Sequence, residues 1–256
     1  MLKGIDVSYA NGNFNWAKYN GGFAMIKATQ GRSDYGTYSA RCVTDSTFQR
    51  NATNCFANGV PFGVYHYLTA KTVVEAREEA EYFVSVIAQY RDRICLWAAV
   101  DVESHQLPTD ARDLTDIVRA FCDAVRLAGY SPMVYTSASW VRYGRFELPQ
   151  GVPLWLALWH VTEKTARKYN PTLWQYGLDD DYQADGNICL ADMRFPVSKM
   201  GKQTYVAGGS YTVKEGDVYT NGKAVPKRYV GKEYTIGKVA EGKIFIPLLF
   251  SWIKTD

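Results

Sequence analysis

The sequence predicts an α/β protein in which a β/α, TIM-like barrel precedes a small all-β domain. Short apolar runs alternate with amphipathic helical segments as far as about Phe195, and the composition changes beyond that point. Alternating strands and helices predict a parallel sheet, and seven or more such units close most economically into a barrel. The chain has 256 residues, of which 47% are hydrophobic, so it can bury a sizeable core and is neither disordered nor collagen-like.

The strands are predicted from apolar runs and the helices from apolar residues at helical spacing. Two helical segments, 73–89 and 113–127, carry charged residues on the face opposite their apolar stripe. Thr109 is the predicted N-cap of the second helix and Gly129 its predicted C-cap. The predicted strands are residues 2–7, 23–27, 60–67, 94–100, 131–135, 153–158 and 172–176.

The second domain is predicted from a change of texture and charge. Residues 197–210 are poor in core-forming side chains and predict a linker between a first domain at 1–196 and a second at 211–256. The second domain shows short β-hairpin patterns, among them an Asn221-Gly222 turn. Residues 197–256 hold 10 basic and 5 acidic side chains, against 19 and 21 in residues 1–196, so the appended module is basic.

Charge, cysteine and histidine content disfavour several functions. A net charge of +3 gives no argument for nucleic acid binding. No cysteine pair has C-x-x-C spacing and no histidine pair has zinc-binding spacing, so no metal or other cofactor is expected. Cys95 and Cys122 lie in apolar runs and are predicted to be buried free thiols of a protein made in a reducing cytoplasm. Neither a signal peptide nor a membrane span is expected, because no apolar run approaches about 18 residues.

The strongest chemical signal is a pair of acids directly after a buried strand. Asp101 and Glu103 follow the apolar run at 94–100, and Asp6 ends the first strand in the same way. Acids at the carboxyl ends of barrel strands are typical of catalytic sites, and their mutual repulsion raises a pKa and so supplies a general acid. Paired acids without metal ligands are typical of glycoside hydrolysis. The same D-x-E pattern also fits carboxylates that cap the next loop or pair with arginines.

Several ordered motifs resemble the family 25 glycoside hydrolases, the lysozymes of the phage and Chalaropsis type. The resemblance covers about residues 1–195 and implies an irregular β/α barrel that cleaves the β-1,4 bond between N-acetylmuramic acid and N-acetylglucosamine. The motifs, in the family's order, are Gly4-Ile5-Asp6-Val7-Ser8, Ile26-Lys27-Ala28-Thr29-Gln30-Gly31, Pro61-Phe62-Gly63-Val64-Tyr65-His66-Tyr67, Asp101-Val102-Glu103, Val134-Tyr135-Thr136-Ser137 and Leu173-Trp174-Gln175-Tyr176.

The resemblance also implies roles for four acids. Glu103 would protonate the leaving oxygen, while Asp101 and Asp6 would polarise the site and stabilise positive charge. The nucleophile stays open between an enzyme carboxylate and the substrate's own N-acetyl group. The family's late acidic residue is assigned to Asp185, in Asp185-Gly186-Asn187, with Asp192 as the alternative.

Aromatic residues at strand ends are the predicted substrate-binding groups. A sugar's apolar face stacks on an aromatic ring, and the chain places such rings where strands end. Trp155 and Trp159 lie in an apolar segment and are predicted to pack instead. The substrate-binding candidates are Tyr65, Tyr67, Tyr135 and Trp174.

The C-terminal module resembles bacterial SH3-like wall-binding domains. The resemblance rests on 230–239 and on Phe250-Ser251-Trp252-Ile253, and it implies binding to peptidoglycan or, through charge, to anionic wall polymers. The resulting hypothesis is a phage endolysin made in the host cytoplasm and acting on the wall after release. The alternatives are an inactive wall glycan-binding protein and a peptidoglycan hydrolase of other specificity, such as a glucosaminidase.

Overall fold

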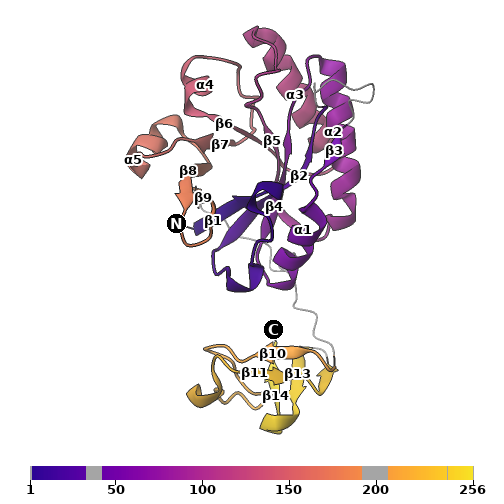
Figure 1. The fold of residues 1–256 in the computed structure, drawn as a ribbon, viewed down its shortest axis with the longest axis vertical. Coiled ribbons are helices and arrows are strands. Elements are labelled where there is room, and N and C mark those ends of the chain that lie inside the picture. The colour runs from indigo at the N-terminus through magenta and orange to yellow at the C-terminus, as the bar shows by residue number, and fades with distance from the viewer. Residues whose placement is uncertain (1, 33–41, 192–206, 241, 256) are drawn as a thin grey trace. The chain divides into compact units, whose positions relative to one another are not determined.

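A computed structural model describes residues 2–32, 42–191, 207–240 and 242–255. The chain divides into two compact units, 1–201 and 202–256 (Figure 1). No helix among the described residues is long and apolar enough to cross a membrane.

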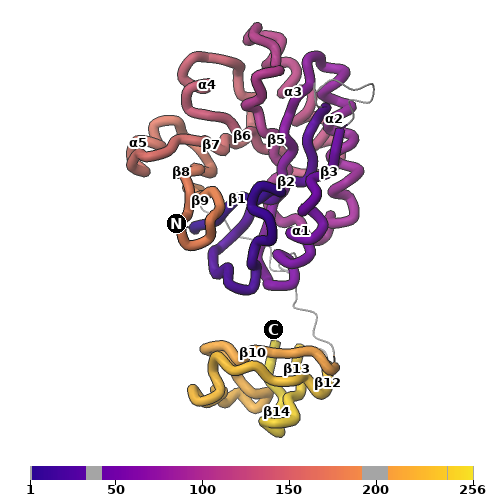
Figure 2. Tube along the Cα trace, viewed as in Figure 1, coloured from indigo at the N-terminus to yellow at the C-terminus, as the bar shows by residue number. Residues whose placement is uncertain are grey.

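The first unit is a mixed α/β domain built on a closed, eight-stranded barrel. The strands run in the order β1, β9, β8, β7, β6, β5, β4, β2, and β1 also pairs with β2, which closes the ring (Figure 2). The short strand β3 (Val43–Thr44) adds to β2 outside the ring. The barrel strands are β1 (Leu2–Val7), β2 (Phe23–Gln30), β4 (Phe62–Tyr67), β5 (Ile94–Asp101), β6 (Pro132–Ser137), β7 (Leu154–Ala157), β8 (Leu173–Asp179) and β9 (Ala184–Cys189).

All seven predicted strands are present. The barrel also contains an eighth strand, β9, which the sequence analysis missed and which makes the barrel irregular. Strand β9 runs antiparallel to both of its neighbours, β8 and β1, whereas the other neighbouring barrel strands pair in parallel. In a regular β/α barrel a helix would connect β8 to a final parallel strand. Here a β-hairpin of β8 and β9 completes the barrel instead.

The helices lie mainly on one side of the barrel, with α1, α2 and α3 beside β2, β4 and β5 (Figure 1). The predicted N-cap Thr109 is wrong: Asp110 caps α3, because its carboxylate accepts from the backbone N–H groups of Arg112 and Asp113. Gly129 follows the C-cap with φ +82°, a conformation that suits glycine. The helices are α1 (Phe48–Ala57), α2 (Val73–Ile87), α3 (Ala111–Leu127), α4 (Ala138–Arg142) and α5 (Glu163–Ala166).

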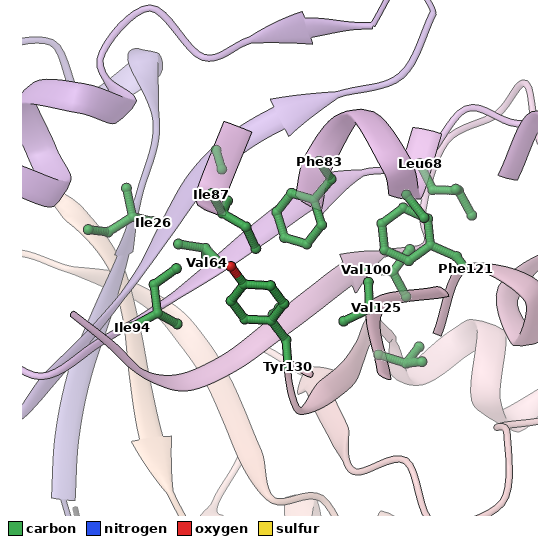
Figure 3. Close-up of a cluster of buried hydrophobic side chains, with 14 of the residues drawn as sticks. Ile26, Val64, Leu68, Phe83, Ile87, Ile94, Val100, Phe121, Val125 and Tyr130 are labelled. Carbon is green, nitrogen blue, oxygen red and sulfur yellow. The ribbon is translucent and has the colours of Figure 1, made fainter. Parts of the chain in front are cut away.

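The barrel strands contribute to two apolar layers, one outside the barrel and one inside it. Each strand reaches both layers because its successive side chains point to opposite faces of the sheet. Outside the barrel, Ile26, Val64 and Val100 meet Phe83 and Phe121 of the helices (Figure 3). A second cluster fills the barrel itself, with members from β2, β4, β5, β6, β7, β8 and β9: Phe23, Met25, Tyr65, Ala99, Met133, Tyr135, Trp155, Leu173 and Cys189. Inward-facing residues that lie beyond this cluster, toward the carboxyl ends of the strands, are not needed to fill the barrel and are available for a functional site.

The second unit consists of two small antiparallel sheets around an apolar core that includes Tyr211, Ile236, Ile244 and Ile253. Its Asn221-Gly222 turn is flanked by an isolated bridge between Val218 and Ala224 rather than by a full hairpin. The strands are β10 (Ser210–Thr212), β11 (Glu233–Thr235), β12 (Lys238–Ala240), β13 (Lys243–Ile246) and β14 (Ser251–Lys254).

The five cysteines are free thiols. Cys122 is buried, whereas Cys95 is only half-buried, so the prediction that both are buried is wrong for Cys95. The apolar run that contains Cys95 becomes fully buried only from Ala98 onward, where β5 enters the middle of the barrel.

Candidate active site

Four carboxyl groups come together at the carboxyl end of the barrel. Asp6 lies on β1 directly opposite Asp185 of β9. Asp101 ends β5, and Glu103 follows two residues later. Electrostatic repulsion couples Asp6 to Asp185 and Glu103, and couples Asp101 to Glu103. The structure therefore gathers four of the predicted acids, and the alternative Asp192 lies outside the described residues.

Asp6 is held by two amide side chains. Its Oδ2 accepts from Nε2 of Gln175 at 2.9 Å and from Nδ2 of Asn187 at 2.7 Å. Two indoles set the orientation of these amides: Trp159 Nε1 donates to Oε1 of Gln175, and Trp155 Nε1 donates to Oδ1 of Asn187. Because an indole N–H can only donate, each amide must turn its oxygen to the tryptophan and its NH2 group to Asp6.

The surroundings favour the protonated form of these acids. Burial, with repulsion from Asp185, raises the pKa of Asp6 to about 7. Burial and repulsion from Glu103 raise the pKa of Asp101 well above its usual range, and its Oδ1 is buried without a hydrogen-bond partner among the described groups. Glu103 is exposed at the rim, yet the strand ends around it remove enough water to raise its pKa.

Lys27 is a buried cation beside this cluster, which the sequence analysis did not single out as a functional residue. Its Nζ donates to Gln30 and lies 5.0 Å from the ring centre of Tyr67. Burial lowers the pKa of Lys27, while its charge offsets part of the rise in the pKa values of Asp101 and Glu103. The signal that could have revealed it is a charged residue directly after the apolar run Phe23-Ala24-Met25-Ile26, at the end of a predicted buried strand.

Three of the four predicted aromatic residues face the interior of the barrel. Tyr65 and Tyr135 pack edge-on against Trp155, and the Tyr135 hydroxyl donates to Gln175 at 3.0 Å. Tyr67, half-buried, lies beside Lys27.

The fourth, Trp174, adjoins Gln175 on β8 and so points to the outer face, away from the carboxyl groups. Trp159, predicted to pack, is 47% exposed and reaches Gln175 from the rim. The prediction of packing is wrong for Trp159, because β7 ends at Ala157 and leaves Trp159 on the loop that follows. Trp155 is buried as predicted.

The residues that the structure describes contain no group of three or more histidine, cysteine, aspartate or glutamate side chains arranged to hold a metal ion. The four carboxyl groups lie in unequal surroundings: Asp6 and Asp101 are buried, Glu103 is exposed and Asp185 is half-buried. Such a group can donate a proton and stabilise a developing positive charge.

The profile of the glycosyl hydrolases family 25 matches residues 5–186, which include all four acids. The chain belongs to this family.

Two curated relatives and one solved structure are similar to the chain. The chain is 29% identical over 191 residues to lysozyme M1 of Streptomyces globisporus, covering 68% of this chain and 61% of that protein. It is 31% identical over 166 residues to the autolytic lysozyme of Clostridium acetobutylicum, covering 63% and 46%. The chain thus spans less than two thirds of the length of either relative. The CTP1L endolysin has a similar structure, with a TM-score of 0.56 and 23% identity, over 73% of this chain and 65% of that one.

Proposed function

We propose that this family 25 protein is a muramidase, which hydrolyses the β-1,4 bond between N-acetylmuramic acid and N-acetylglucosamine in bacterial peptidoglycan. The observation that carries the proposal is the convergence of Asp6, Asp101, Glu103 and Asp185 on one end of the barrel. Glycoside hydrolysis requires a protonated acid on the leaving oxygen and a carboxylate that stabilises the oxocarbenium-like transition state. The relatives named lysozymes support the choice of substrate.

Glu103 is the proposed general acid. It is exposed at the rim, where a substrate from solvent can reach it, and its raised pKa keeps a proton available. Repulsion from Asp185 adds to the effect of burial and opposes ionisation of Glu103. Asp6, oriented by Gln175 and Asn187, assists by presenting a fixed carboxyl group to the sugar, with Asp185 opposite.

The bond specificity is tested by digesting purified peptidoglycan, reducing the fragments with borohydride and identifying the reduced ends by mass spectrometry. A muramidase yields reduced muramic acid ends. Reduced glucosamine ends would instead identify a glucosaminidase, and glycan binding without new reducing ends would identify an inactive binding protein.

The role of Glu103 is tested with Glu103→Gln, which keeps the size of the side chain and removes the acidic proton that a general acid donates. Turnover should fall by about 10²–10⁴-fold, the usual contribution of general acid catalysis. Glu81→Gln, on the exposed face of α2, is the matched control and should retain activity. Near-normal turnover by Glu103→Gln, with an unchanged fold, would contradict the assignment.

The proposed role of the second unit is to bind the wall. Its small antiparallel sheets and apolar core fit an SH3-like module, and its basic side chains suit peptidoglycan or anionic wall polymers. Together with the similarity to the CTP1L endolysin, this supports an endolysin that acts on the wall after release from the host cytoplasm. The full chain should sediment with purified walls, and a chain ending at residue 201 should do so more weakly. Equal sedimentation of the two chains would contradict a role of the second unit in wall binding.

A further inference from the structure

The outer face of β8 and β9 carries a cavity that the catalytic chemistry does not use. Its volume is about 530 Å³, and its lining includes Lys3, His160, Trp174, Tyr176 and Asp180. Trp174 and Tyr176 lie two residues apart on β8, so both face away from the barrel interior. Their ring centres are 6.0 Å apart, edge to face. Trp174 is only 4% exposed, so the aromatic surface that the cavity presents is mainly that of the half-buried Tyr176.

The two aromatic rings are held rigidly. A Cβ at Gly186 would lie 2.2 Å from the Tyr176 ring, so only glycine there lets the ring lie flat on β9. The Tyr176 hydroxyl donates to Asp179 at 2.7 Å, and the Trp174 indole donates to the backbone oxygen of Leu158 at 2.7 Å. The two rings are therefore fixed in place before any ligand arrives, which lowers the entropy cost of binding.

A neighbouring cavity extends this surface. It has a volume of about 400 Å³ and shares Lys3 with the first cavity. Its lining includes Tyr19, Asp179, Asp181 and Tyr182. Two adjoining cavities on one sheet face suit an extended, repeating ligand better than a single small molecule.

Trp159 connects the outer cavity to the active site. On one side its Nε1 donates to Gln175, which in turn donates to Asp6. On the other side its ring lies next to Gly177, a residue of the outer cavity, where a Cβ would be 3.9 Å from the ring. Trp159 therefore contacts both the hydrogen-bonded network of Asp6 and a residue that lines the outer cavity.

The charges decide the class of polymer. Three acids, Asp179, Asp180 and Asp181, line the two cavities, and the lining contains one permanent cation, Lys3. This excess of negative charge opposes anionic wall polymers and phosphate. Aromatic rings beside carboxylates suit neutral sugars, which offer apolar faces for the rings and hydroxyl donors for the carboxylates.

We propose that the outer face of β8 and β9 is a second glycan-binding surface, which holds the peptidoglycan strand beyond the bond being cut. The proposal rests on the proposed function, because it requires the ligand of the active site to be a glycan polymer. It assigns Lys3, Tyr176 and Leu178 to substrate retention, with Trp174 packed against the ring of Tyr176. Leu178 is 54% exposed at the edge of the cavity and extends its apolar wall.

Binding is tested with tri-N-acetylchitotriose and the full chain carrying Glu103→Gln, so that the sugar is not consumed. The indole N–H signals of the seven tryptophans report the position of the sugar by NMR. The signal of Trp174 should shift, while that of Trp252 in the second unit should not. Lys3→Ala should weaken this binding about tenfold, as expected for the loss of one hydrogen bond from a charged donor.

Kinetics on long glycan strands give an independent test. The carboxyl groups of their muramic acid residues are blocked as amides, so that the strand is as neutral as the charge argument requires. Lys3→Ala and Leu178→Ser should raise KM several-fold and leave kcat unchanged, since neither residue contacts the reacting bond. Leu127→Ser, at an exposed leucine of α3, is the control and should change neither constant.

A native chain that hydrolyses peptidoglycan while the Trp174 signal stays unmoved, with unchanged KM in both variants, would overturn the second surface and leave the proposed function intact. A native chain that releases no reducing ends would instead overturn the proposed function, and with it the proposal that this surface holds the strand being cut.

Discussion

The burial of Asp6 should make the stability of the barrel depend on pH in a specific direction. The pKa of Asp6 rises from 3.8 to about 7 because the residue is buried and faces Asp185. In the unfolded chain Asp6 ionises near pH 4, whereas in the folded chain it retains its proton to near neutrality. Between these values the folded state binds more protons, so the free energy of unfolding falls as the pH rises.

The magnitude follows from the size of the change in pKa. At about 1.4 kcal/mol per pH unit, a rise from 3.8 to about 7 corresponds to roughly 4 kcal/mol of lost stability once the pH exceeds the folded pKa. Asp6→Asn has no proton to lose, and its oxygen can still accept from Gln175 and Asn187. The variant should therefore match the native chain near pH 4 and exceed its stability by up to about 4 kcal/mol near pH 8.

Urea unfolding followed by tryptophan fluorescence measures this difference. Six of the seven tryptophans lie in the first unit, so the signal reports mainly on the barrel. The comparison requires both chains at each pH, with equal slopes against urea concentration. A difference in unfolding free energy that does not change between the two pH values would refute the reasoning, as would a native chain that becomes more stable over this range.

Two further predictions concern activity and the outer layer of the barrel. Hydrolysis should decline on the alkaline side as Glu103 loses its proton, at a pH above the ordinary range of a glutamate, and a rate that keeps rising with pH would exclude Glu103 as the acid. Glu79→Leu should lower the free energy of unfolding by about 3 kcal/mol, because the buried carboxylate accepts from His66 and from the backbone and hydroxyl of Thr69, and these groups would lose their partner. Thermal and urea unfolding would measure this loss, and the exposed Glu81→Leu serves as its control.

Local patterns in the sequence predicted most of the elements. Each of the seven predicted strands exists, and the two predicted long helices differ from the observed ones by a few residues at their ends. The acids Asp6, Asp101 and Glu103 were found because each follows a buried apolar run, and a polar side chain at that position is conspicuous in one sequence. The change of composition after Phe195 likewise predicted the second domain from the sequence alone.

Tertiary structure decided which face of each strand lines the site. The strands of a barrel that is covered by helices are apolar on both faces, so alternation along the sequence does not reveal which face lies inside. Trp174 and Gln175 are adjacent, and only the closure of the ring shows that Gln175 points to Asp6 and Trp174 to the outside. Trp159 joins the site for the same reason, through a loop whose path no local pattern predicts.

The sequence by itself determined the family resemblance, the barrel and three of its acids, because these depend on residue types and short-range spacing. The tertiary structure decided the antiparallel pairing that sets Asp185 opposite Asp6, the indole donors that orient the amides, and the buried Lys27 beside Asp101. Asp6 and Asp185 are far apart in the chain, and their contact depends on the register of β1 against β9. Register is a property of the whole closed sheet, since every neighbouring pair of strands must satisfy it at once.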